Sequence, residues 1–435
     1  MTVVASGVLV VTVGAVVARQ LLRRGPPVWV LLLLGAFLTV GFGVIPLDGA
    51  SLAVAQQLPI LGFLFALFVF AASLEQAGAL DHLATWILSR IRRSADVPLV
   101  LFVAFALLSA FLLNDALVLI GVPLLFPLAR RLRVAPEPLL LTLAFAVTVG
   151  STLTPFGNPQ NLLVSLGSGL DAPVATFLRY LLVPTAINIV LGGWYLRRVF
   201  APDLAEPGDP QLGTRPPKVP FFPASGLAGA VRRTPALALF PLTLLVLITL
   251  DVTSVATAGP AVPLYLIALG GSIVTLLVTP GRTAILARID WPILVLFGAL
   301  FVVVAGAESG GALAALESAL PLPSPSDRVG SLATILVTSV LGSQLVSNVP
   351  WVGLQIPVLR AAGFGAATPW AWMALAAGST LAGNLTLLGA ASNLIVVEQA
   401  ERAGVRISLA RFVRIGLPLT VISVTVLFVC LLVGL

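Results

Sequence analysis

Long apolar runs alternate along the chain with short loops that carry most of its charge. The runs are roughly 18–22 residues long, which matches the thickness of a bilayer when they are helical. They do not alternate apolar and polar positions, as the strands of a membrane barrel would. The pattern therefore predicts an all-α polytopic membrane protein with about 10 transmembrane helices.

Two further apolar stretches, residues 97–131 and 329–360, contain polar residues near the middle. These are Asn114-Asp115 in the first stretch and Ser347-Asn348 in the second. The first stretch, from Asp96 to Arg130, is too long for one crossing and short for two full ones. We therefore expect two re-entrant hairpins whose tips lie at these polar residues.

Residues 139–166 and 370–397 are interrupted in another way, and we expect each to be a broken helix. The first contains Thr154-Pro-Phe-Gly-Asn-Pro-Gln-Asn161. Two prolines remove backbone donors there, and Gly157 permits unusual backbone angles. Such backbone at membrane depth lines a cavity or is buried in protein, and it frees carbonyl groups and helix N-termini for a ligand. The alternative is a structural kink.

The second interruption, Thr386-Leu-Leu-Gly389-Ala-Ala-Ser-Asn393, stands in the matching place without the prolines. The segments Glu75–Leu80 and Glu308–Leu313 precede the two polar tips by similar distances. Glu75 to Asn114 is 39 residues and Glu308 to Asn348 is 40. Landmarks in the same order and at similar spacing predict an internal repeat.

Charge placement sets the orientation of these repeats. With both broken stretches as hairpins, 21 of the 24 basic residues fall in loops on one side, as the positive-inside rule requires of cytoplasmic loops. The two repeats then run in opposite directions. We predict an N-terminal span plus the first inverted repeat in residues 1–198, a cytoplasmic linker in 199–233, and the second inverted repeat in 234–435.

The net charge of +7 is thus explained by membrane orientation, and we expect no nucleic-acid partner. The chain has one cysteine and one histidine, and no metal cluster, phosphate loop or nucleophile with a base is recognisable. We expect a multi-pass protein of the cell inner membrane that is not an enzyme.

Asp115 is the one carboxylate deep inside an apolar stretch. A charge there costs about 2.5–3.5 kcal/mol, which makes it a functional candidate by default. The alternative role is a cap on the helix that follows. The second half has Asn348-Val349 at this place, so the acid belongs to one half alone.

At these motifs the chain resembles the ion transporter superfamily, which includes arsenite permeases of the ArsB type, NhaD-type sodium/proton antiporters and divalent anion/sodium symporters. The similarity covers roughly residues 25–430 and extends to permeases with a citrate-transporter domain. It implies a scaffold domain, an elevator-like transport domain and a homodimer. An arsenite-type protein would also have a soluble ATPase partner.

The resemblance also implies sodium sites. Carried over by position, one would use Ser109, Asn114 and Gly157, and the other Ser343, Val346, Asn348 and Gly389. The symporters have Ser-Asn-Thr at both tips, where this chain has Leu113-Asn114-Asp115 and Ser347-Asn348-Val349. That departure argues against a dicarboxylate and favours the arsenite and antiporter branches.

The predicted function is secondary active transport of a small anion or oxyanion, coupled to H⁺ or Na⁺, without another cofactor. Alternatives are a sodium/proton antiporter, an arsenite efflux permease and an uncoupled channel. The predicted substrate- and ion-binding residues are Ser109, Asn114, Asp115, Thr154, Gly157, Asn158, Asn161, Ser343, Ser347, Asn348, Thr386, Gly389 and Asn393.

Overall fold

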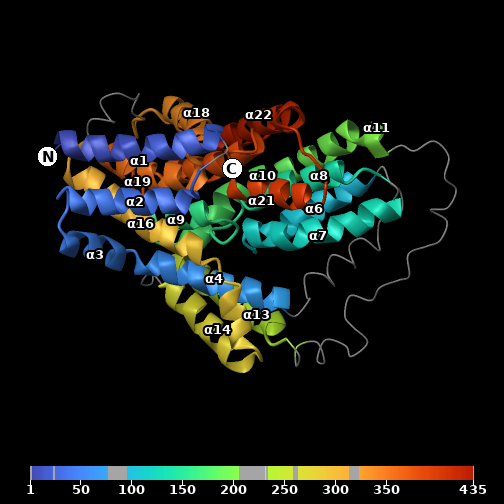
Figure 1. The fold of residues 1–435 in the computed structure, drawn as a ribbon, viewed down its shortest axis with the longest axis horizontal. Helices are drawn as coiled ribbons and strands as arrows, with labels where there is room; N and C mark the ends of the chain where they lie inside the picture. The colour runs from blue at the N-terminus through green and yellow to red at the C-terminus, as the bar shows by residue number, and fades with distance from the viewer. Residues whose placement is uncertain are drawn as a thin grey trace.

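The protein folds into helices that run mostly along one long axis (Figure 1). The computed structural model describes residues 2–22, 25–76, 96–132, 134–204, 231, 234–257, 263–312 and 323–434. Within these residues there is no strand, and seven helices are long and apolar enough to cross a membrane. The predicted all-α membrane fold is confirmed. Most of the predicted linker 199–233, and the ends of the segments that begin at Glu75 and Glu308, lie outside the described residues.

The helices of the first half break where the sequence predicts. The run 97–131 is divided before Asn114, and the run 139–166 is divided over residues 151–158. The helices are α1 (Thr2–Leu22), α2 (Val28–Gly41), α3 (Leu47–Gln56), α4 (Leu58–Gln76), α6 (Val97–Ser109), α7 (Asn114–Leu132), α8 (Pro136–Gly150), α9 (Pro159–Gly167), α10 (Pro173–Val199) and α11 (Ala201–Leu204).

The second half has corresponding breaks, at Ser347 and over residues 385–390. Its helices are α13 (Ala236–Thr257), α14 (Leu264–Val278), α15 (Arg282–Ala287), α16 (Trp291–Ser309), α18 (Arg328–Val346), α19 (Asn348–Ala361), α20 (Pro369–Leu381), the short 3₁₀ helix η3 (Ala382–Asn384), α21 (Ala391–Arg402) and α22 (Leu409–Val433).

Proline and short polar side chains start many of these helices. Proline stands at the first or second position of α6, α8, α9, α10, α16 and α20, where its missing N–H and fixed φ are tolerated. Asn158, Asp290 and Ser408 cap α9, α16 and α22 by accepting a bond from a first-turn N–H. The interruptions are therefore local features of the sequence.

The helices pack as two bodies, each with members from both halves of the chain. Helices α1–α4 pack with α13–α16, and we call this group the scaffold body. Helices α6–α11 pack with α18–α22, and we call this group the core body. In Figure 1, α1, α2 and α16 lie toward one end of the molecule, α6, α7 and α8 lie toward the other, and α13 and α14 lie below.

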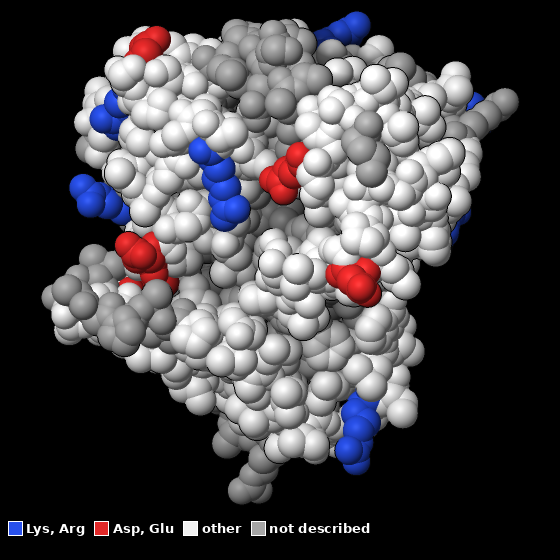
Figure 2. All heavy atoms as spheres, turned by 90° about the vertical axis from the view of Figure 1, so that its left-hand side faces the viewer, with Lys and Arg blue, Asp and Glu red and all other residues white. Residues whose placement is uncertain are grey.

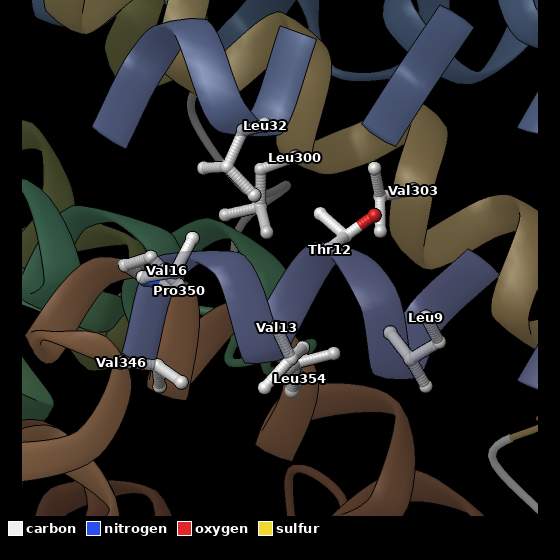
Figure 3. A pocket seen from close by; sticks show the side chains of 10 residues that line it. All are labelled: Leu9, Thr12, Val13, Val16, Leu32, Leu300, Val303, Val346, Pro350 and Leu354. Carbon is white, nitrogen blue, oxygen red and sulfur yellow. The ribbon is translucent and has the colours of Figure 1, made fainter. Parts of the chain in front are cut away.

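The contact between the two bodies is largely apolar. Figure 3 shows a small space where Leu9, Val13 and Val16 of α1 face the tip of the second hairpin stretch. That tip contributes Val346, Pro350 and Leu354. Deeper in the molecule, the rings of Phe63 on α4 and Phe156 in the first break stack at 5.5 Å, with an angle of 3° between their planes. Apolar contacts of this kind are not directional, so they do not fix the position of one body along the other.

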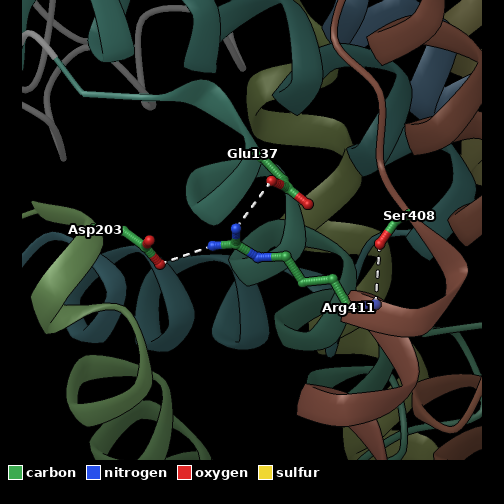
Figure 4. A network of polar contacts seen from close by, with 4 residues as sticks. All are labelled: Glu137, Asp203, Ser408 and Arg411. Carbon is green, nitrogen blue, oxygen red and sulfur yellow. Dashed lines mark hydrogen bonds and ion pairs between the residues drawn. The ribbon is translucent and has the colours of Figure 1, made fainter.

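Within the core body, Arg411 joins three helices at one end (Figure 4). Its guanidinium lies 3.3 Å from Glu137 on α8 and 2.7 Å from Asp203 on α11. Its backbone nitrogen donates to Ser408, the cap of α22, at 3.1 Å. The side chains are partly exposed, so the network orients α22, α8 and α11 more than it stabilises the fold.

Charged side chains are sparse at the N-terminal end of α1. On the face shown in Figure 2, basic and acidic residues stand as separate spots among uncharged ones.

Candidate functional site

The first tip, between α6 and α7, is fastened to the break between α8 and α9. The hydroxyl of Thr154 donates to the carbonyl of Ala110. The backbone nitrogen of Asn114 donates to the carbonyl of Gly157 at 3.0 Å. Behind the tip, the hydroxyl of Ser109 donates to a carbonyl of α8 at 2.8 Å. Tip and break therefore form one unit.

Two asparagines hold the first break open. Asn158 accepts a bond from the backbone nitrogen of Asn161 at 2.8 Å and so caps α9. The side-chain amide of Asn161 donates to the carbonyls of Ser151 at 2.9 Å and Thr154 at 3.1 Å. A helix interrupted at this depth loses backbone bonds, and these amides replace them.

Only glycine fits at position 157, because a larger residue would clash with neighbouring backbone atoms. A Cβ atom there would lie 2.4 Å from the carbonyl oxygen of Ser151 and 2.9 Å from that of Ser109. Both are backbone atoms that cannot turn aside. The glycine thus allows the break to approach the first tip closely.

The second break makes equivalent bonds. Asn393 donates to the carbonyls of Gly383 and Thr386, ten and seven residues earlier, which are the offsets that Asn161 uses. The hydroxyl of Thr386 accepts from the backbone nitrogen of Leu388 at 3.1 Å, as that of Thr154 does from Phe156. The sequence match between the two halves therefore extends to matching local structure.

Thr386 also reaches the second tip. Its hydroxyl donates to the side-chain oxygen of Gln344, near the end of α18, at 2.7 Å. The amide of Gln344 donates in turn to the carbonyl of Ala382 at 2.8 Å. Gly389 lies against these groups, since a Cβ there would be 2.8 Å from that carbonyl. A side chain joins tip and break here, where the first half uses the carbonyl of Ala110.

The halves differ in how fully their polar atoms are bonded. Thr380 on α20 accepts bonds from the side chains of Asn158 and Gln160, each at 3.2 Å, which completes the first break from the other half of the chain. In the second half, several buried side-chain atoms in the described part of the chain have no hydrogen-bond partner. Those at the second tip and break include Ser343 Oγ, Asn348 Oδ1, Asn384 Oδ1 and Nδ2, Ser392 Oγ and Asn393 Oδ1.

Both tips line one cavity of about 230 Å³. Its walls are formed by Arg19, Val28, Asn114, Asp115, Pro159, Gln160, Ile293, Leu296, Phe297, Ser347, Asn348, Val349, Pro350, Ala390, Ala391 and Leu394. The first residues of four helices, α7, α9, α19 and α21, are among them. The helix dipole gives each such end a partial positive charge.

Two charged residues, Asp115 and Arg19, line this cavity, and a third, Asp290, lies near Asp115. Asp115 in the first turn of α7 is 7% exposed. Asp290, the cap of α16, lies close enough to repel it electrostatically, and burial raises the pKa of Asp290 itself. Arg19, in the last turn of α1, lines the cavity from the scaffold body.

Ser347 at the second tip has a left-handed backbone conformation, with φ at 72°. It is the one residue other than glycine with positive φ among those that the structure describes. Such backbone costs of order 1–3 kcal/mol and is maintained where the surroundings demand it. The serine stands directly at the cavity, at the residue that separates α18 from α19.

The structure places the predicted residues in three settings. Asn114, Asp115, Ser347 and Asn348 line the cavity, while the Val346 side chain faces the apolar contact between the bodies. Ser109, Thr154, Gly157, Asn158, Asn161, Ser343, Thr386, Gly389 and Asn393 lie in or behind the tips and breaks.

Sequence reasoning missed Arg19, Gln160, Thr380 and Asn384. Gln160 stands inside the predicted motif, which was a usable signal. Arg19 has the same sequence context as Arg23 and Arg24, so nothing marked it as a cavity residue. Thr380 gains its role only from the packing of the two halves, and the Asn384 side chain is buried beside the second break without a hydrogen-bond partner.

The fold is that of a multi-pass membrane protein with a cavity between its two helix breaks. The profile of the citrate transporter family matches residues 9–378, and the chain belongs to this family, within the ion transporter superfamily. The silicon efflux transporter LSI3 of Oryza sativa subsp. japonica is 29% identical over 413 residues, covering 85% of this chain and 84% of that protein. A 46 kDa membrane protein of Mycobacterium leprae is 26% identical over 371 residues, with 84% and 83% covered.

Solved transporter structures share the fold. The YdaH transporter of Alcanivorax borkumensis superposes with a TM-score of 0.57 at 16% identity, covering 90% of this chain and 89% of that chain. MtrF of Neisseria gonorrhoeae superposes with a TM-score of 0.52 at 11% identity, with 98% and 94% covered. At these identities the similarity concerns the fold alone.

Proposed function

We propose that the protein is a secondary active transporter that moves a small anion or oxyanion across the cell inner membrane, coupled to H⁺ or Na⁺. The observation that carries this proposal is the convergence of four helix N-termini on one cavity between the two tips. In a site with little water, such ends favour a negatively charged or strongly hydrogen-bonding ligand. The relatives support a small polar cargo, since the family is named for citrate and the rice protein for silicon efflux.

The cation side of the proposal rests on oxygen atoms in the second half. Ser343 Oγ, Asn348 Oδ1 and Asn393 Oδ1 are buried without hydrogen-bond partners, and uncharged oxygens of this kind suit Na⁺. In the first half, Ser109 Oγ donates to Val147, and Asn114 Oδ1 accepts from the backbone nitrogen of Asp115 at 2.9 Å. The second half thus fits a sodium ion better than the first half, where Asp115 would bind the coupling proton or cation.

Transport requires the cavity to open to each side in turn. The core body carries both tips and both breaks, and its contact with the scaffold body is largely apolar. A sliding motion of the core body along α1 and α4 would move the site as a unit, in an elevator-type mechanism. The re-entrant course of both hairpins and the inversion of the two repeats belong to this proposal, supported by the charge distribution and the matching bonds.

The test is a stability screen on purified protein with citrate, phosphate, sulfate, arsenite and silicate, each with and without sodium. At least one of these compounds should raise the melting temperature, and sodium should strengthen the effect. That compound should then accumulate against its gradient in proteoliposomes with an imposed proton or sodium gradient. Flux that only dissipates gradients would indicate a channel, and absence of any solute effect would overturn the proposal.

Sodium/proton antiport without another substrate is the second candidate, favoured by the buried position of Asp115. A sodium-driven pH change in proteoliposomes without added anion would support it. Strict dependence of that pH change on an anion would exclude it.

A further inference from the structure

Arg19 brings a full positive charge to the cavity from outside the core body. It lies in the last turn of α1 and is partly buried. It shares the cavity wall with Asn114, Gln160 and Asn348. The cavity therefore combines four helix N-termini with a guanidinium group, and these are the two kinds of group that most often bind anions in proteins.

The guanidinium of Arg19 forms no hydrogen bond, ion pair or ring contact with any residue that the structure describes, whereas several other described arginines are paired. Arg411 bridges Glu137 and Asp203, and Arg402 pairs with Glu398 at 2.6 Å. An arginine that lines a cavity and is unpaired has its donors available for a bound molecule.

The second observation is that Arg19 and the rest of the site belong to different bodies. Arg19 is on α1, which packs mainly with α2 and α16 and also contacts α18 at the boundary, while the tips and breaks lie in the core body. Any displacement of the core body along the apolar contact would separate Arg19 from the helix N-termini. The Arg19 guanidinium and the four helix N-termini would therefore lie together in only one of the two end states of such a motion.

We propose that Arg19 is a specificity-determining residue that contacts the anion only while the cavity is next to the end of α1, and so raises affinity on one side of the membrane. This inference rests on the proposed function and deepens it. The bound species must carry negative charge, such as a carboxylate or a phosphate-like oxyanion, because a guanidinium gains little from a neutral solute. Charge placement assigns that side to the cytoplasm.

Binding is tested first, with citrate, phosphate and sulfate as probes at constant ionic strength. In melting-temperature titrations of the full-length protein, Arg19→Gln should need about 10- to 100-fold more of the stabilising anion than wild type, and Arg19→Lys should lie between them. Arg402→Gln is the matched control, since it removes an exposed arginine with no relation to the cavity. It should titrate as wild type does.

The side of action is tested with right-side-out and inside-out vesicles. Arg19→Gln should raise the KM for the stabilising anion about 10-fold or more at the cytoplasmic side and leave the KM at the other side unchanged. An equal rise on both sides would overturn the one-sided role. Identical titrations of wild type and Arg19→Gln would overturn the assignment of Arg19 while the proposed function stands. If none of the three anions stabilises wild type, the anion site itself fails.

Discussion

Asp251 on α13 accepts a hydrogen bond from the backbone nitrogen of Ala175 on α10 at 2.7 Å, across the boundary between the two bodies. The residue before α10, Ala172, has no side chain that can cap the helix. Asp251 therefore caps α10 from the neighbouring body, where its charge also suits the helix dipole. It adds a directional bond to a contact that is otherwise largely apolar.

Replacing Asp251 by Ala should destabilise the protein by about 0.5–2 kcal/mol, because a partly buried first-turn N–H of α10 loses its capping acceptor. Asp251→Asn keeps an acceptor oxygen and should cost less. Thermal unfolding in detergent measures both, with Asp48→Asn on α3 as a control in an exposed first turn. A melting temperature for Asp251→Ala equal to that of wild type would show that this cap contributes nothing to stability.

Gly157→Ala should disrupt the first tip. The added methyl group would overlap the backbone of Ser151 and Ser109, and overpacking of this kind costs typically about 1–3 kcal/mol. Transport should fall at least as steeply, because the break can no longer approach the tip. Gly298→Ala is the matched control, since a Cβ there meets no atom within 4 Å. Flux and melting temperature should both distinguish the two variants, and normal flux in Gly157→Ala would contradict the close packing.

Both interruptions were predictable from the sequence because their causes are local. The sequence alone shows proline and glycine inside the run 139–166. It also shows an acid, Asp115, inside the run 97–131. The division into two bodies was not predictable, since it depends on which helices pack together over long separations. Thr380 illustrates the difference, because it completes the first break through a bond to Asn161, 219 residues away. The unpaired oxygens of the second half follow from the same packing.

Asn161→Ala and Asn393→Ala should both abolish transport, but with different effects on stability. Asn161 donates to at least two carbonyls and accepts from Thr380, so its loss leaves several buried groups unpaired. Asn393 donates to Gly383 and Thr386, while its side-chain oxygen has no partner. Its removal should cost less stability and should weaken any stabilisation by sodium.

Melting curves with and without sodium test this difference between the two asparagines, and proteoliposome flux tests the common loss of transport. Equal sodium effects in wild type and Asn393→Ala would remove Asn393 from the cation site. Wild-type flux in either variant would assign that asparagine a purely structural role.

Asp115→Asn should separate substrate binding from coupling. A carboxylate buried in the first turn of a membrane-embedded helix is stable only when a proton or a cation accompanies it during the transport cycle. Asparagine has nearly the same shape and still suits the first turn of α7, but it binds no proton and carries no charge. Anion binding, measured by melting shifts, should therefore persist, while transport loses its dependence on pH or sodium.

The decisive measurement is proteoliposome flux across a pH series, with and without sodium, for wild type and Asp115→Asn. If H⁺ is the coupling ion, the pH dependence of wild type should flatten in the variant. If Na⁺ is the coupling ion and Asp115 binds it, the sodium stimulation should disappear. Glu398→Gln on α21 is a control, because it removes an exposed carboxylate outside the cavity. Identical pH and sodium profiles for wild type and Asp115→Asn would assign Asp115 the role of a helix cap, and coupling would then have to arise at the unpaired oxygens of the second half.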